Sequence, residues 1–379
     1  MKLETFSYTI RTGWSVQPFP DLDSDRTLVI VFSAPEFVDT PEPIEALVQA
    51  YPSSHVIGCS SSGEIFDAKI SDGSMAVGVL QFEYSSVAST AAPVQSADES
   101  YEAGRTLAKE LARPDLRAVL VLSDGLSVNG SELVRGINSV LPRAVVVTGG
   151  LAGDADRFAR TWVLERGRPA SGLVSAAGLY GERVVVGHGS KGGWDIFGPE
   201  RLVTRSDHNV LYELDGRPAL ELYKEYLGER ASGLPATALL FPLALRSDST
   251  GDDSVVRTIL AVDEDKQSMT FAGDIPEGWQ AQLMRANFDR LVDGASGAAL
   301  ATRDACKDGQ PTLAVAISCV GRRLVLGERT EEETEATLEV LPEGTQQIGF
   351  YSYGEISPLT NGRCDLHNQT MTLTTIRER

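Results

Sequence analysis

Two loops carry serine, glycine and glutamate at matching positions, and these residue types could bind a small polar ligand. Residues 58–65 read GCSSSGEI and residues 349–356 read GFYSYGEI. Both follow apolar runs typical of strands buried on two faces. Ligands bind at the carboxyl ends of such strands, where backbone N–H groups converge. We therefore expect a pocket near these loops and strand ends, with ligand contacts from Ser61, Gly63, Glu64, Ser123, Cys319, Arg322, Gly354 and Glu355.

Two other interpretations of the same loops remain open. The glycines could only make tight turns, with the glutamates capping backbone. Alternatively, Cys59 or Cys319, each just after a strand, could be an enzyme nucleophile with Glu64 or Glu355 as acid or base. No histidine stands at a recognisable spacing from either cysteine, and the nucleophile elbow, the P-loop and the dinucleotide-binding fingerprint are absent.

A third chemistry involves His188, in the glycine-rich segment 187–193 (GHGSKGG), which is expected to end a strand in a turn. A neutral imidazole there could ligate a haem iron. Trp194 and Phe197 follow, and their rings could wall a flat cofactor. The alternative is a turn histidine hydrogen-bonded to nearby backbone.

Three copies of one unit position these residues. Apolar runs at 28–33, 119–123 and 314–318 each end at a serine, and each precedes an amphipathic helix that stops before a proline, at Pro52, Pro142 and Pro342. Another strand and a glycine loop follow, the middle loop being 149–154 (GGLAGD). Such repeats imply right-handed βαβ crossovers. We predict an α/β fold of two domains, with mixed sheets and added antiparallel strands.

The added strands and insertions are expected at defined places. Runs 75–83 with 86–92, and 171–180 with 184–189, should form two antiparallel pairs, and 369–376 a last strand. Helices are predicted near 220–227, ended by Gly228, and over about 277–300; residues 246–255 look like a linker or loop. The predicted domains are an N-terminal extension (1–24), an N-terminal domain (25–216) and a C-terminal domain (217–379).

Composition narrows the function classes. Of 379 residues, 42% are hydrophobic and 23% charged, as in ordinary globular proteins. Lys plus Arg total 34 against 53 for Asp plus Glu, a net charge of −19 that argues against nucleic acid or an anionic membrane as partner. The four cysteines lack metal-site spacing, and neither a secretion signal nor an 18-residue apolar stretch occurs. We expect a cytoplasmic protein with reduced thiols.

The chain resembles the FIST family of bacterial sensory proteins, which have FIST N and FIST C domains. The matching stretches are 58–65, 149–154, 214–227 (LDGRPALELYKEYL), 271–276 (FAGDIP), 318–322 (SCVGR), 349–356 and 366–370 (LHNQT). The resemblance implies a cytoplasmic ligand-binding sensor that acts in trans on a histidine kinase or another signalling protein. Amino acids are among the ligands proposed for the family. Whether the chain forms a homodimer is left open. Residues 187–205 look like the NosP-type subgroup, free-standing sensors of nitric oxide, which implies haem b with His188 as axial metal ligand and Trp194 beside it.

Overall fold

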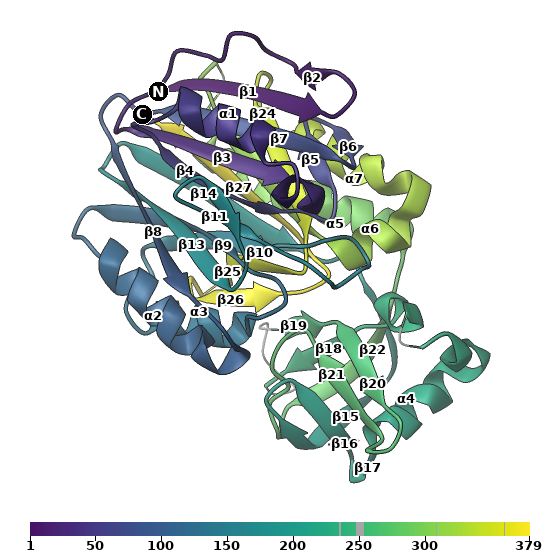
Figure 1. Cartoon of the computed structure of the whole chain (residues 1–379). Coiled ribbons are helices and arrows are strands. Elements are labelled where there is room, and N and C mark those ends of the chain that lie inside the picture. Colours follow the sequence, from purple (N-terminus) through teal and green to yellow (C-terminus); the bar gives the residue numbers. More distant parts are fainter. Residues whose placement is uncertain (235, 248–253, 308, 360) are drawn as a thin grey trace.

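The chain folds into a large body and a smaller one (Figure 1). The computed structural model describes residues 1–234, 236–247, 254–307, 309–359 and 361–379. Residues 1–194 and 286–379 form the large body, and residues 195–285 form the small body. The two chain ends lie together, with the Met1 amino group 3.3 Å from Glu378. The large body is therefore closed by segments from both ends of the sequence.

The predicted strand–helix–strand repeats are confirmed. In each unit a helical segment joins two parallel, neighbouring strands. The first is β3 (Thr27–Ser33), α1 (Glu42–Ala50) and β4 (His55–Ser60); the second is β9 (Leu116–Ser123), α3 (Gly130–Asn138) and β10 (Val146–Leu151); the third is β23 (Leu313–Cys319), α6 (Val320–Leu326), α7 (Thr330–Val340) and β24 (Gln346–Ser352). The α/β class with mixed sheets follows directly.

The three units are interlocked by exchanged strands. After its glycine loop, each unit adds a strand to the sheet of another unit: β5 (Glu64–Phe66) pairs with β24, β11 (Val163–Glu165) with β4, and β25 (Gly354–Pro358) with β10. The exchange runs in a closed ring from the first unit to the third, from the third to the second, and from the second to the first. As a result, the three glycine loops come together.

Antiparallel strands complete the sheets, although the two predicted antiparallel pairs are wrong. β7 (Ser74–Gln81) pairs with β3 and β1 (Lys2–Thr9), while β8 (Ser86–Pro93) pairs with β13 (Leu173–Tyr180) in another sheet. β14 (Val184–Lys191) pairs with β27 (Met371–Glu378) and not with β13. Every residue of β13 is buried, so it needs sheet neighbours on two sides and a cover on two faces, which one hairpin partner does not supply.

Short strands and further helices finish the large body. At the sheet edges lie β2 (Gly13–Trp14), β6 (Lys69–Ser71), β12 (Arg168–Ala170) and β26 (Cys364–His367). α2 (Ser100–Leu111) packs on α3, and α5 (Phe288–Thr302) packs on α7 and β14. The sheets enclose a core with residues from all three units, in which the rings of Phe32 and Phe350 stack 4.6 Å apart.

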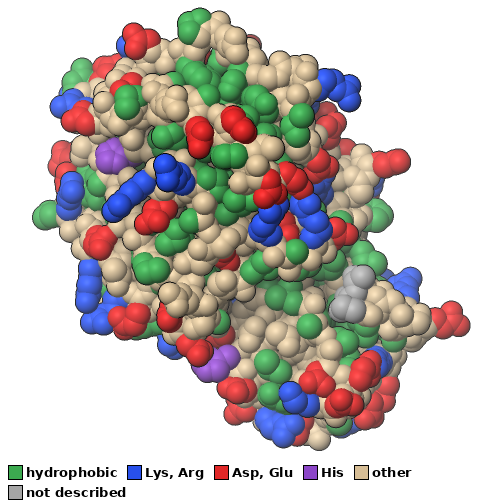
Figure 2. All heavy atoms as spheres, in the orientation of Figure 1, with side chains coloured by type: hydrophobic (Ala, Val, Ile, Leu, Met, Phe, Trp, Pro, Cys, Tyr) green, Lys and Arg blue, Asp and Glu red, His purple; other side chains and the backbone are tan. Residues whose placement is uncertain are grey.

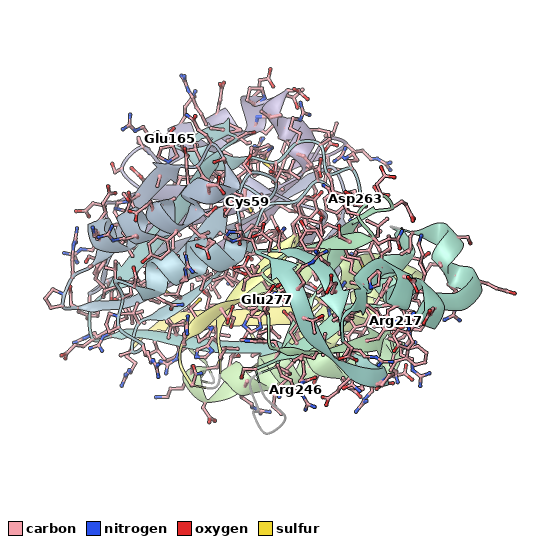
Figure 3. The ribbon with its side chains drawn as sticks, turned by 90° about the horizontal axis from the view of Figure 1, so that it is seen from below. Cys59, Glu165, Arg217, Arg246, Asp263 and Glu277 are labelled. Atoms are coloured by element: carbon pink, nitrogen blue, oxygen red, sulfur yellow. The ribbon has the colours of Figure 1, made fainter. Side chains whose placement is uncertain are left out.

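The described residues of the small body form an antiparallel sheet with one α-helix. Its strands are β15 (Asp195–Asp207), β16 (Val210–Leu214), β17 (Arg217–Pro218), β18 (Leu243–Arg246), β19 (Ser254–Arg257), β20 (Ile259–Asp263), β21 (Ser268–Phe271) and β22 (Gln280–Arg285), and its helix is α4 (Ala219–Leu227). Gly228 ends α4 as predicted, at φ 58°. Residues 248–253 of the predicted linker lie outside the described residues. Arg217, Arg246 and Asp263 belong to this body in the view from below (Figure 3).

The predicted helix over 277–300 is wrong in its first part. Residues Gln280–Arg285 form β22, which hydrogen-bonds to β15 on one side and β18 on the other. Ala281 and Leu283 point into the small core, a period of two that coincides with helical spacing over so short a run. α5 begins only at Phe288, because the Asn287 side chain accepts a hydrogen bond from the Arg290 N–H and caps the helix there.

The two bodies do not divide the chain where the sequence domains were predicted to meet. The predicted boundary at 216/217 falls inside the small body, between β16 and α4. The ranges 1–24, 25–216 and 217–379 stay a prediction about sequence domains.

Candidate functional site

The three glycine loops meet at one place in the large body. Ser62 of the first loop donates its backbone N–H to Tyr351 O at 2.8 Å. Its hydroxyl accepts the Ala155 N–H at 2.9 Å, beside the middle loop, and the Tyr353 hydroxyl accepts the Asp154 N–H at 3.2 Å. The three loops are therefore joined by direct hydrogen bonds.

A cavity of about 930 Å³ opens at the first loop. One wall comes from the first unit and the opposite wall from α6 and the start of α7 in the third unit. Ser61, Ser62 and Glu64 line it, with Asp156 and Arg157 from the segment after the middle loop. The other polar residues of the lining are Glu36, Thr40, Asp72, Arg323, Glu328, Thr330 and Glu331, and its apolar residues include Ile10, Phe37, Ile70 and Leu324.

Glu64 is the buried acid of this cavity. The residue is 2% exposed, and Oε2 accepts hydrogen bonds from the Ser74 N–H at 3.0 Å and the Ser74 hydroxyl at 2.8 Å. Burial raises the pKa of Glu64 to about 8, because the charged form loses water, and the nearby Asp72 carboxylate adds to the rise while the bonds from Ser74 oppose it. Near neutral pH this carboxyl group is mostly protonated.

Glu355 occupies the equivalent position in the third unit, where the site is closed. Oε2 accepts from the Thr370 N–H at 3.2 Å and the Thr370 hydroxyl at 2.9 Å, the same pair of donors that Ser74 supplies to Glu64. Oε1 accepts from the Ser352 hydroxyl at 2.7 Å. Burial raises the pKa of Glu355 to about 8 as well. Both carboxyl oxygens of Glu355 are thus used within the protein.

The first site differs from its duplicate in facing a cavity. Ser61 corresponds to Ser352, and its hydroxyl oxygen accepts the Gly63 N–H at 2.8 Å. A hydrogen bond from the Ser61 side chain opposes the rise in the pKa of Glu64, as one from Ser352 does for Glu355. Ser61 and Glu64 line the cavity, whereas Ser352 and Glu355 line none of the cavities found among the described residues, so only the first pair is open to a ligand.

Two arginines of the cavity are engaged by protein groups. Arg323 makes two 2.8 Å hydrogen bonds to the Asp72 carboxylate and one to Ser62 O. Arg157 donates to Glu36 and to Asp154 O. Gly63 makes room for Arg323: at φ +131°, a Cβ there would lie 2.5 Å from the guanidinium group.

The other predicted ligand residues lie away from the cavity. The buried Ser123 hydroxyl donates to Asp124 O at 2.9 Å. Arg322 is fully buried, with an ion pair to Glu333 at 2.7 Å and bonds to the backbone carbonyls of Gly192 and Leu291. Gly354 pairs with Leu151 in the sheet. The structure thus brings Ser61, Gly63 and Glu64 together and uses Ser123, Arg322, Gly354 and Glu355 in internal packing.

The cysteines are not placed for nucleophilic chemistry. Cys59, Cys319 and Cys364 are buried, and Cys59 lies among the strands of the large body (Figure 3). Burial raises the pKa of the Cys319 thiol to about 12, with the Glu355 charge adding to the rise, and it raises the thiol pKa of Cys59 even without a neighbouring charge. The thiolate form that a nucleophile needs is therefore disfavoured at both predicted positions.

His188 and Trp194 do not form a haem pocket. His188 lies within β14, opposite Thr374 of β27, so the predicted turn is wrong. The flanking glycines pack against α5; a Cβ at Gly189 would lie 2.1 Å from Ala298 O. The Trp194 indole donates to Gln369 O at 2.8 Å and packs against Met284, Leu291, Val325 and Leu326. Neither side chain lines the main cavity or the four smaller ones found among the described residues. The residues present do not fit a haem at this position.

Several cavity residues were missed from the sequence. Arg323 directly follows the predicted Arg322, and Arg157 lies three residues after the Asp154 of the middle glycine loop, so proximity to these motifs was the available signal. Ser62 stands inside the predicted first loop. No cluster of three or more His, Cys, Asp or Glu side chains suited to a metal ion occurs in the part of the chain that the structure describes.

Comparison with protein families places this site in context. The FIST N domain model matches residues 27–217, and the FIST C domain model matches residues 219–358. The chain belongs to the FIST family. FIST domains are associated with signal transduction and the sensing of small ligands. The Glu64 cavity lies between segments of the two FIST domains. A search of curated proteins found no match. Among the described residues, no helix is long and apolar enough to cross a membrane.

Proposed function

We propose that this FIST protein is a sensor that binds a small polar ligand in the cavity at Glu64. The observation that carries the proposal is the different surroundings of the two duplicated acids. Glu64 and its neighbour Ser61 line a cavity of about 930 Å³, whereas Glu355 and Ser352 line none of the cavities found among the described residues. Binding sites for small molecules are concave and present a few polar groups that fix the ligand's orientation, as Ser61 and Glu64 do here.

Ligand binding would connect two parts of the fold. Ser61 and Glu64 come from the FIST N segment, while Arg323, Thr330 and Glu331 come from the FIST C segment. A ligand that contacts both walls favours one arrangement of α6 and α7 against the first loop, which is how ligand occupancy shifts a conformational population. We propose that the shifted surface acts on a signalling partner in trans, with a histidine kinase as the partner class implied by the family.

The polar-ligand alternative is preferred to haem and to an enzyme on structural grounds. The residues around His188 and Trp194 offer no cofactor pocket, so nitric oxide sensing through haem b draws no support from them. The cysteine-enzyme alternative lacks an accessible thiolate at Cys59 or Cys319.

A matched pair of serine variants tests the proposal. Ser61→Ala should remove a ligand contact, while Ser352→Ala should remove only the internal bond to Glu355. A panel of amino acids, amines, dicarboxylates and sugars is screened against the full chain by thermal shift, and hits are measured by calorimetry. We expect a hit whose affinity falls in Ser61→Ala and is kept in Ser352→Ala. If no compound binds, or if both variants bind alike, the cavity is not the sensory site.

A further inference from the structure

We infer that a second pair of cavities, beside α3 and β26, binds a small molecule that carries a phosphate group. An outer cavity of about 480 Å³ lies beside α3, and an inner one of about 180 Å³ lies between α3, β26 and the small body. The two cavities are neighbours, because Arg135, Asn138 and Arg363 line both. Neither shares a lining residue with the Glu64 cavity, so this site is separate from the proposed sensory site.

The outer cavity is positively charged. Arg135, Arg143 and Arg363 line it, and none of its described lining residues is an acid. Arg143 and Arg363 are exposed, and neither guanidinium group has an ion pair or a hydrogen bond within the described ranges. On the face shown in Figure 2, by contrast, acidic and basic side chains are intermixed. In a chain with a net charge of −19, three arginines without a lining acid form a local site that attracts anions.

Contacts within the protein hold Arg135 at this cavity. Its Nη2 donates to Glu132, three residues earlier on α3, and its guanidinium carbon lies 5.0 Å from the centre of the Tyr101 ring. Because the bond to Glu132 uses Nη2 alone, Nε and Nη1 keep their N–H donors for a ligand. Arg135 is therefore oriented by the protein and still able to donate.

Arg257 of β19 is an independent, buried positive charge at the same site. Its side chain is 5% exposed and lines the inner cavity. Nε and Nη1 donate to the backbone carbonyls of Asp274, Val256 and Leu366 at 3.0–3.2 Å. Among the described residues, the one carboxylate oxygen within ion-pair distance is Asp365 Oδ1, 4.0 Å from Nη2. A buried charge without a close counter-ion is costly, so an anion where the two cavities join recovers part of that cost.

The three acids of the inner cavity are held by donors of the protein. Each accepts a hydrogen bond: Glu132 from Arg135, Asp274 from the Asn129 side chain at 3.0 Å, and Asp365 from the Leu366 N–H at 2.8 Å. The outer cavity has no such acid among its described residues. The anionic group of a ligand therefore belongs in the outer cavity, on the side where it joins the inner one.

A phosphate group matches these donors better than a carboxylate group. A phosphate monoester carries a charge of about −1.5 to −2 at pH 7 and three acceptor oxygens, whereas a carboxylate has one charge and two oxygens. The guanidinium fork binds phosphate oxygens in pairs, and the three arginines stand on α3, after α3 and before β26. Small-molecule sites have volumes of roughly 300–1,000 Å³, so the outer cavity of about 480 Å³ has room for an organic part as well.

Phosphate esters and the alcohols from which they derive form the decisive ligand pairs. Binding of AMP and adenosine, glucose phosphate and glucose, phosphoserine and serine, and glycerol phosphate and glycerol is measured by calorimetry on the full chain. We expect at least one ester to bind at least tenfold more tightly than its alcohol. Its affinity should fall at least tenfold in the double variant Arg143→Gln with Arg363→Gln and stay within twofold in Arg105→Gln. Arg105 is the matched control, because it is an exposed arginine that lines neither cavity.

The double variant changes only exposed side chains, so we expect it to fold, and a urea melt checks this. If none of the four esters binds, or if the double variant binds them as the wild type does, the site is refuted. Succinate that binds as tightly as the esters would overturn the assignment of phosphate. Polyglutamate that binds through Arg143 and Arg363 while the esters do not would indicate an acidic protein partner instead. Ester binding that is lost in Ser61→Ala and kept in the double variant would belong to the Glu64 cavity and would also overturn the inference.

Discussion

The two buried glutamates make the stability of this protein depend on pH in an unusual direction. Their pKa is raised from an ordinary 4.5 to about 8 in the folded state. Above pH 4.5 the unfolded chain releases these protons while the folded chain keeps them. The free energy of unfolding therefore falls as pH rises through this range, since the folded state binds more protons.

The magnitude follows from the two pKa values. Between pH 7 and pH 8 the unfolded glutamates are already ionised, and the folded ones go from mostly protonated to half ionised. Each group then lowers the free energy of unfolding by about 1 kcal/mol over this unit, so the pair lowers it by about 2 kcal/mol. Glutamine resembles the protonated acid in shape and hydrogen bonding, so Glu64→Gln and Glu355→Gln should each remove half of this dependence.

Urea unfolding at pH 7.0, 7.5 and 8.0 measures the effect in the wild type, both single variants and the double variant. Burial lowers the pKa of His55, His188 and His367, which gives an opposite dependence centred below pH 7. The double variant keeps these histidines, so its curve is the baseline. The reasoning is refuted if wild type and double variant show the same dependence between pH 7 and pH 8.

Three further predictions concern other predicted residues. Arg322→Met leaves Glu333 buried without its partner and should lower the free energy of unfolding by about 3–5 kcal/mol in urea melts. Arg105→Met, in an exposed ion pair, should change the free energy of unfolding by less than about 1 kcal/mol. Equal losses in the two variants would contradict a structural role for Arg322. A thiol reagent should label Cys306 in the native protein and the other three cysteines only in denaturant, and fast native labelling of Cys59 would revive the enzyme alternative. Added haemin should give the same absorption spectrum with wild type and His188→Ala, and a Soret band lost in the variant would restore the haem prediction.

The fold was predicted correctly where the local sequence pattern and the tertiary packing favour the same element. Apolar runs, a helix and a proline recur in each unit, and these local signals produced the parallel strand pairs β3–β4, β9–β10 and β23–β24. The exchanged strands β5, β11 and β25 could not be predicted from the sequence, because they have three to five residues, too few to show which sheet they join. The segment 280–285 failed for a similar reason, since periods of two and 3.6 coincide over six residues.

By itself the sequence determined that this chain has three related units and that Glu64 and Glu355 are equivalent, because both properties are written in local residue order. Only the tertiary structure decided that one of these acids faces a cavity. Glu64 lines it beside Ser61, whereas Glu355 lines none of the cavities found among the described residues. The arginines and the other acids around Glu64 likewise meet only through long-range packing, which brings residues about 260 positions apart into hydrogen-bond contact, as in Ser62 and Arg323. Charge and hydrogen-bond supply at a cavity depend on such long-range neighbours, and no local pattern encodes them.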